Sequence, residues 1–143
     1  MPRYRELPFL ERLVGRALRA ADPPVCGGRV STDLPADAGE PARPWPVCTY
    51  ERLGGAPAVK QKLDTGRIQV AVWGATQSEA HQQAEYARRV LHEMEGTVQD
   101  NGAAWVSAVE DETGLTRADD PVTGRDRYVF SVLVYASMYA PAA

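Results

Sequence analysis

Two periodicities of apolar residues predict two helices and five strands along the chain. Apolar positions recur at helical spacing near the N-terminus and after residue 76, and they alternate with polar positions in shorter stretches. The first predicted helix begins near Leu7, and the second spans Thr76 to Glu95. The predicted strands cover residues 29–32, 47–53, 67–73, 104–110 and 127–139. This α-β-β-β-α-β-β order indicates an α+β fold, with a mixed or antiparallel sheet of about four to five strands and both helices on one face.

Both predicted helices have recognisable ends. The first stops at Asp22-Pro23-Pro24, because proline cannot continue a helix. The second opens with Thr76 as N-cap and Glu79 three residues later, a capping box in which each side chain satisfies the other residue's free amide, and Gly96 ends it. A stripe of mostly small residues along this helix predicts close packing against a sheet; it comprises Ala80, Ala84, Ala87, Leu91 and Met94.

The last predicted strand carries apolar side chains on both faces. One face comprises Tyr128, Phe130, Val132, Val134, Ala136 and Met138, and the other comprises Val129, Leu133, Tyr135 and Tyr139. Two helices can cover one face of the sheet but not both. The second face therefore predicts a homo-oligomer, because soluble monomers rarely expose an apolar patch of this size.

Three long loops are predicted within a single domain that spans residues 1–143. They cover about residues 33–46, 54–65 and 111–126. Loops of this length in a compact domain are usually functional or disordered. Arg43 and Trp45 give the first loop a charged and aromatic tip, and the third loop is acidic.

Composition excludes several classes of function. The 143 residues suit one domain, and a net charge of -3 provides no large positive field for non-specific binding of nucleic acid. Cys26 and Cys48 have neither zinc-site spacing nor the density of a disulfide scaffold, so two buried thiols are expected. His81 and His92 are too far apart on one helix to share a metal ion. Neither a signal peptide nor a membrane span is apparent, and no cofactor is expected.

The candidate catalytic motifs are weak. Asp64-Thr65-Gly66 spells the triplet of aspartic proteases, in which two such aspartates share a proton and activate water. A polar stretch precedes this triplet and Arg67 follows it, so a turn before the strand is the favoured interpretation. The carboxylates of the third loop do not follow the register of a calcium-binding loop. The sequence therefore predicts no catalytic or metal-binding residues and no enzyme.

Three stretches of the chain resemble the tail terminator proteins of long-tailed bacteriophages, also called tail-completion or tail-to-head joining proteins. They are residues 64–74, 80–91 and 126–132. Members of that family similarly show an arginine-led strand, a helix rich in alanine, and a closing strand introduced by a charged residue and an aromatic one. The resemblance extends from about residue 7 to residue 139.

The resemblance implies a structural protein of the virion that is assembled in the host cytoplasm. Such proteins form a hexameric ring that caps the head-proximal end of the tail tube, ends tube polymerisation and docks to the head-completion (stopper) protein. DNA would pass through the lumen without specific binding. In this reading the candidate residues of subunit or tube interfaces are Arg43, Trp45, Arg117, Arg125, Tyr135 and Tyr139.

Two other interpretations stay open at this point. The chain could be another head-tail connector or a tail tube component, because tube proteins share related sheet architecture. It could also be a small α+β ligand-binding or hydrolytic domain whose active loop is the segment from Asp111 to Asp126. Mass in solution separates the last class from the others, because a ring-forming chain gives hexamers or assembles on tubes.

Overall fold

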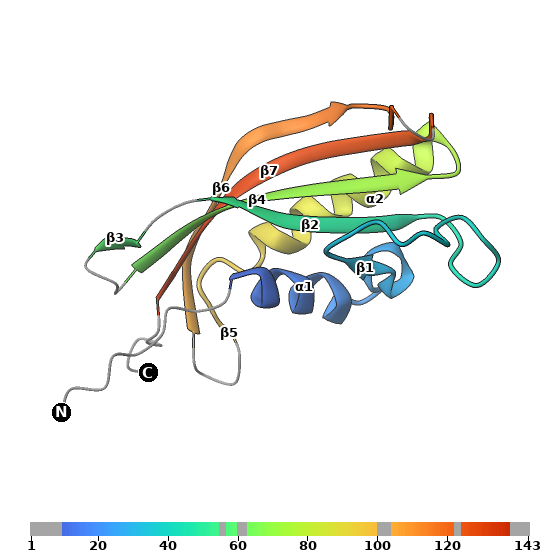
Figure 1. The fold of residues 1–143 in the computed structure, drawn as a ribbon. Helices are drawn as coiled ribbons and strands as arrows, with labels where there is room; N and C mark the ends of the chain where they lie inside the picture. Colours follow the sequence, from blue (N-terminus) through green and yellow to red (C-terminus); the bar gives the residue numbers. More distant parts are fainter. Residues whose placement is uncertain (1–9, 55–56, 60–62, 100–103, 122–123, 138–143) are drawn as a thin grey trace.

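The elements of the chain follow the predicted order, with two additional short strands. The computed structural model describes residues 10–54, 57–59, 63–99, 104–121 and 124–137 (Figure 1). Its elements are α1 (Leu10–Ala20), the 3-10 turn η1 (Val25–Gly28), β1 (Val30–Ser31), β2 (Val47–Gly54), β3 (Pro57–Val59), β4 (Leu63–Gly74), α2 (Gln77–His92), β5 (Thr97–Gln99), β6 (Ala104–Arg117) and β7 (Asp126–Ser137).

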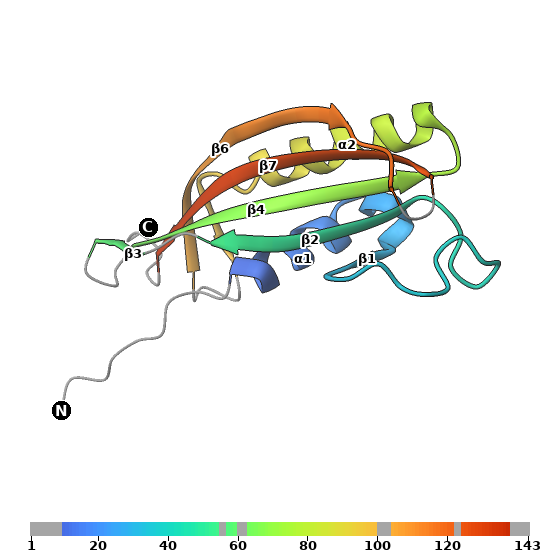
Figure 2. The same ribbon diagram turned by 45° about the horizontal axis from the view of Figure 1, so that its top comes forward.

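A curled mixed sheet forms one layer, and both helices lie on the same side of it (Figures 1 and 2). The strand order is β1-β2-β4-β7-β6-β5, and β3 pairs with β4 beside this path. Only β1 and β2 are parallel; every other described pair is antiparallel. The predicted α+β class is therefore confirmed. The predicted strand number was too low because β3 and β5 have three residues each, too few to show alternation.

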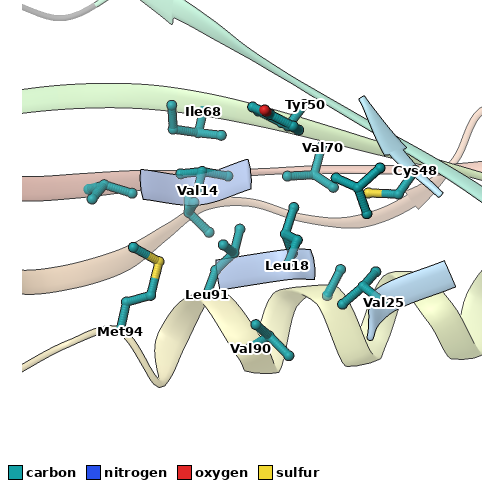
Figure 3. Packing of buried hydrophobic residues seen from close by; sticks show 14 of the residues in the cluster. Val14, Leu18, Val25, Cys48, Tyr50, Ile68, Val70, Val90, Leu91 and Met94 are labelled. Atoms are coloured by element: carbon teal, nitrogen blue, oxygen red, sulfur yellow. The ribbon is translucent and has the colours of Figure 1, made fainter. Parts of the chain in front are cut away.

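The hydrophobic core fills the space between the helices and the sheet. Figure 3 shows Val14 and Leu18 of α1, Leu91 of α2, and Ile68 and Val70 of β4 in this layer. The central strand β7 contributes the even-numbered residues of its inward face, all of them buried: Tyr128, Phe130, Val132, Val134 and Ala136. A valine or phenylalanine side chain among them contributes about 1.5–3 kcal/mol when it is removed from water.

The junction between β4 and α2 is tight. The Glu79 N–H donates to Thr76 Oγ1 over 3.1 Å, as the capping box predicts, while Glu79 Oε1 accepts from the Ala75 N–H rather than from Thr76. A Cβ atom on Gly74 would lie 2.6 Å from the backbone nitrogen of Ala80. Glycine at position 74 therefore lets the strand pass directly into the helix.

Asp64 lies in β4 and not in a turn, so the predicted turn was wrong. β4 continues to Leu63 because β7 offers a partner along its whole length, ending in the pair Leu63 and Ser137. Asp64 is 2% exposed, and its carboxylate accepts two hydrogen bonds from the Arg52 guanidinium, over 2.7 and 2.8 Å. These bonds raise the pKa of Arg52 above its usual value. The carboxylate is thus neutralised by an ion pair at one end of the sheet.

Two of the three predicted loops are shorter than expected. β6 extends seven residues beyond its predicted end at Glu110 and reaches Arg117, so residues 111–117 belong to a strand. The pairing with β7 shifts register at three places along β6, and these irregularities allow polar residues and Gly114 to remain in the strand. The predicted loop 54–65 likewise contains β3 and the start of β4.

Replacing Asp64 tests the ion pair. We expect Asp64→Ala to lower the free energy of unfolding by about 3 kcal/mol, because it leaves the Arg52 guanidinium without its buried partner. Chemical denaturation measures the change. The control Asp37→Ala breaks an exposed pair with Arg43, whose side chains are 49% and 43% exposed, and is expected to cost less than about 1 kcal/mol. Equal losses in the two variants would contradict this assignment.

Candidate interaction surfaces

The face of the sheet opposite the helices, here called the outer face, is only partly covered. Val129, Leu133 and Tyr135 of β7 are half-buried there. Polar groups lie among them: the Tyr135 hydroxyl donates to Glu110 Oε2 over 3.2 Å. Partial burial and the nearby negative charge of Glu110 raise the pKa of Tyr135. The outer face is therefore a mixed surface, less apolar than β7 alone predicts, because β6 adds carboxylates to it.

The loop between β6 and β7 covers one end of the outer face. Trp73 is 6% exposed, and its indole N–H donates to Asp120 Oδ2 over 3.1 Å. The Arg127 guanidinium lies 5.6 Å from the centroid of the Trp73 ring. The β6–β7 loop thus covers this end of the outer face. Farther along the same face, a hollow of about 200 Å³ lies next to Val129 and Leu53. The Leu53 residue is 48% exposed.

Residues 32–46, here called the arm, fold into successive turns rather than an extended loop. The Gly39 N–H donates to the Arg43 carbonyl, and the Arg43 N–H donates to the Glu40 carbonyl, each over 2.8 Å. Gly39 has φ 89°, and a Cβ atom there would lie 2.7 Å from Trp45 Nε1. Glycine thus allows the arm to close over the indole ring.

The arm meets the β6–β7 loop through two of the predicted interface residues. The Arg125 guanidinium lies 5.5 Å from the Trp45 ring centroid, within cation–π range. We call this the arm–loop contact. Beside it is a hollow of about 470 Å³ whose lining includes Leu34, Pro35 and Glu40. The structure therefore brings Trp45 and Arg125 together, although they are far apart in sequence.

The other predicted interface residues lie elsewhere. Arg43 remains within the arm, with its Nε 2.9 Å from Asp37 Oδ1. Arg117, at the end of β6, donates to Asp119 over 3.1 Å, to Asp126 over 3.0 Å and to Gln77 over 2.9 Å, and the bond to Asp119 raises its pKa. This network ties the start of α2 to the strand ends. Tyr139 lies outside the described residues.

Sequence reasoning missed an ion-pair cluster on the helix side of β6. Asp111 accepts hydrogen bonds from Arg88 Nε over 3.0 Å and pairs with His92 Nε2 over 2.8 Å, and Arg88 Nη2 also contacts it. The bond from Arg88, assisted by His92, lowers the pKa of Asp111. The cluster was not predicted because Asp111 was assigned to a loop. Only its pairing with Val132 in the β6–β7 ladder shows that it lies on the side of the sheet that faces α2.

Groups that could carry chemistry are sparse in the described part of the chain. It contains no cluster of three or more histidine, cysteine or acidic side chains able to hold a metal ion. Cys26 and Cys48 are free and buried, as predicted, and the pKa of Cys48 is raised by a hydrogen bond with Cys26 and by burial. Within the same residues, no helix combines the length and apolarity needed to cross a bilayer.

A family model described as phage tail termination protein matches residues 6–123. No curated protein matches the chain.

A double-mutant cycle tests the arm–loop contact. We expect Trp45→Ala and Arg125→Ala to show a coupling free energy of about 0.5–1 kcal/mol, because a partly exposed cation–π pair is worth that much. Denaturation of the two single variants and the double variant measures it. A matched cycle of Trp45→Ala with Arg67→Ala should give no coupling, since Arg67 pairs with Glu112 on the outer face. Additive effects of the Trp45 and Arg125 changes would show that the contact contributes no energy.

The Asp111 cluster predicts a dependence of stability on pH. A carboxylate whose pKa is lowered in the folded state stabilises the protein above its unfolded pKa of about 3.9, and this stabilisation is lost as pH falls through the folded pKa. Asp111→Asn should therefore lower the free energy of unfolding by about 1 kcal/mol at pH 7 and by progressively less below pH 4. Thermal melts of both proteins from pH 7 to pH 3 measure this difference. A difference that stays constant over that range would rule out the ionised pair.

Proposed function

Because the chain belongs to the phage tail termination protein family, we propose that it forms a ring that caps the head-proximal end of a phage tail tube. A structural role in the phage tail follows from the family. The ring, the cap and the junction with the head are the proposed part of this role. In this role the protein ends tube polymerisation and joins the tail to a head-completion protein.

The observation that carries the proposal is the partly covered outer face. Val129, Leu133 and Tyr135 remain half-buried because both helices lie on the other side of the sheet. Half-buried apolar side chains beside carboxylates and arginines suit a surface that a neighbouring subunit completes, since interfaces combine an apolar centre with a polar rim. The partner in this proposal is another copy of the chain.

The ends of the subunit supply different surfaces for other partners. The arm and the β6–β7 loop lie at one end of the sheet, and β3 lies at the other (Figures 1 and 2). A ring of such subunits has two unlike rims. One rim can match the last ring of a tube while the other offers no site for the next tube subunit, so that growth ends by lack of complementarity. The arm–loop contact, with Trp45 and Arg125, is the candidate docking surface on the rim formed by the arm and the β6–β7 loop.

The proposed role is structural and not enzymatic. Both oxygens of the Asp64 carboxylate accept hydrogen bonds from Arg52, which leaves this group poorly suited to share a proton with a second aspartate. In the segment from Asp111 to Asp126, residues 111–117 lie in β6, which pairs with β7. These observations support a binding role for the surfaces of the sheet.

Assembly of the purified protein tests the proposal. We expect native mass spectrometry to show a closed oligomer, either alone or after addition of purified tail tubes, and we expect tube growth to stop when the protein is present. Tyr135→Glu should weaken assembly at least about tenfold, because placing a second negative charge beside Glu110 at the interface costs more than about 1.4 kcal/mol.

A variant on the other side of the molecule controls for the charge itself. Gln82→Glu adds the same charge at an exposed position of α2 and should assemble like the unaltered protein. The proposal fails if the unaltered protein remains a monomer in the presence of tubes and tube growth continues. If the protein copolymerises along the tube and does not stop it, a tube component is the better assignment.

A further inference from the structure

Among the residues that the structure describes, the sheet has an unpaired stretch of strand at each edge. At one edge β5 pairs with Ala104–Val106 of β6, so that in the described structure the rest of β6, to Arg117, pairs only with β7. At the other edge β1 pairs with Cys48 and Thr49 of β2, and within the described ranges residues 50–54 of β2 pair only with β4. Unpaired backbone amides and carbonyls at a sheet edge are a template for pairing with another chain.

Side chains mark where each unpaired stretch ends. The Val109 N–H donates to Glu95 Oε1 over 3.1 Å, so a side chain occupies this amide of β6. The Gly54 carbonyl accepts a hydrogen bond from Arg52 Nε over 3.0 Å, so a side chain occupies this carbonyl at the end of β2. The stretches that remain available are therefore residues 110–117 of β6 and residues 50–53 of β2.

These two stretches stand at the same level of the sheet. Glu51 is opposite Gln69, Gln69 is opposite Ser131, and Ser131 is opposite Thr113. One row thus crosses the four strands from one open edge to the other. A second copy placed beside the first in the same orientation would bring its β2 stretch level with the β6 stretch of the first copy.

The strand directions also match. Three successive antiparallel pairings separate β2 from β6, so β6 runs opposite to β2 within the sheet. A neighbour in the same orientation would therefore present its β2 antiparallel to β6, and the alternation would continue across the junction. Both stretches expose side chains to solvent, including Glu51 and Leu53 of β2 and Glu110 and Thr113 of β6.

We infer that neighbouring copies join by antiparallel pairing of residues 110–117 of β6 with residues 50–53 of β2 in the next copy. The inference rests on the proposed ring and adds to it a contact between sheet edges, beside the contact proposed for the outer face. Because the two edges differ, the contact is head-to-tail, and such contacts close into a ring when the rotation between copies allows. The bulges of β6 bend and twist the strand at this edge, which suits the curvature that a closed ring requires.

Cysteine cross-linking tests which edges meet. Glu51→Cys protein is co-expressed with Thr113→Cys protein, and the assembled complex is oxidised mildly. We expect disulfide-linked dimers in this mixture and none with either variant alone, because a head-to-tail contact never places two copies of one edge together. Strand tilt in a ring displaces the register between neighbours, so Glu110→Cys and Thr116→Cys, at outward-facing positions on either side, are paired with Glu51→Cys as well.

Two controls make the result decisive. Gln82→Cys on α2, combined with Glu51→Cys, should give no dimers, and the unaltered protein reports any background from the buried Cys26 and Cys48. If native mass spectrometry shows a ring but none of the three edge mixtures cross-links, the strand pairing is wrong while the proposed function stands. Dimers from the Glu51→Cys protein alone would also overturn it. If dimers form only in the edge mixtures but tube growth does not stop, the pairing stands and the capping function fails.

Discussion

The ladder between β4 and β7 is the interaction on which the rest of the structure depends. It pairs every residue from Leu63 with Ser137 to Gly74 with Asp126 without a register shift, at the centre of the sheet. Because side chains alternate along both strands, this single register places one row of each strand against the helices and the other row on the outer face. The core and the outer face are therefore two sides of the same pairing.

Much of the fold could be predicted because long elements carry a clear period. The buried face of β7, the small-residue stripe of α2 and the Thr76 cap were all apparent from spacing alone. What could not be predicted depended on a partner strand. Asp64 looked like a turn residue, and Asp111 looked like part of a loop, until pairing with β7 placed both in strands and gave each an arginine partner. Local preference is weak evidence where a long neighbour continues the ladder.

The candidate surfaces were only partly predictable for a similar reason. An aromatic and a basic residue on separate loops suggested Trp45 and Arg125, but no pattern in the sequence indicates that these two side chains contact each other. The open edges of β2 and β6 follow from strand order, which requires the three-dimensional arrangement. The family assignment indicates a structural protein of the phage tail. The geometry of the sheet suggests which of its surfaces can bind other subunits.

The pairing of Arg52 with Asp64 has a consequence for how this protein can vary among phages. Loss of one of these residues leaves the other charged in a poorly hydrated site and destabilises the fold. Simultaneous replacement of both by apolar residues changes the free energy of unfolding little or even raises it. Substitutions at these two positions should therefore arise together in evolution. Homologous tails would carry either the complete pair or neither member, and co-variation of positions 52 and 64 would identify the same strand end in related sequences.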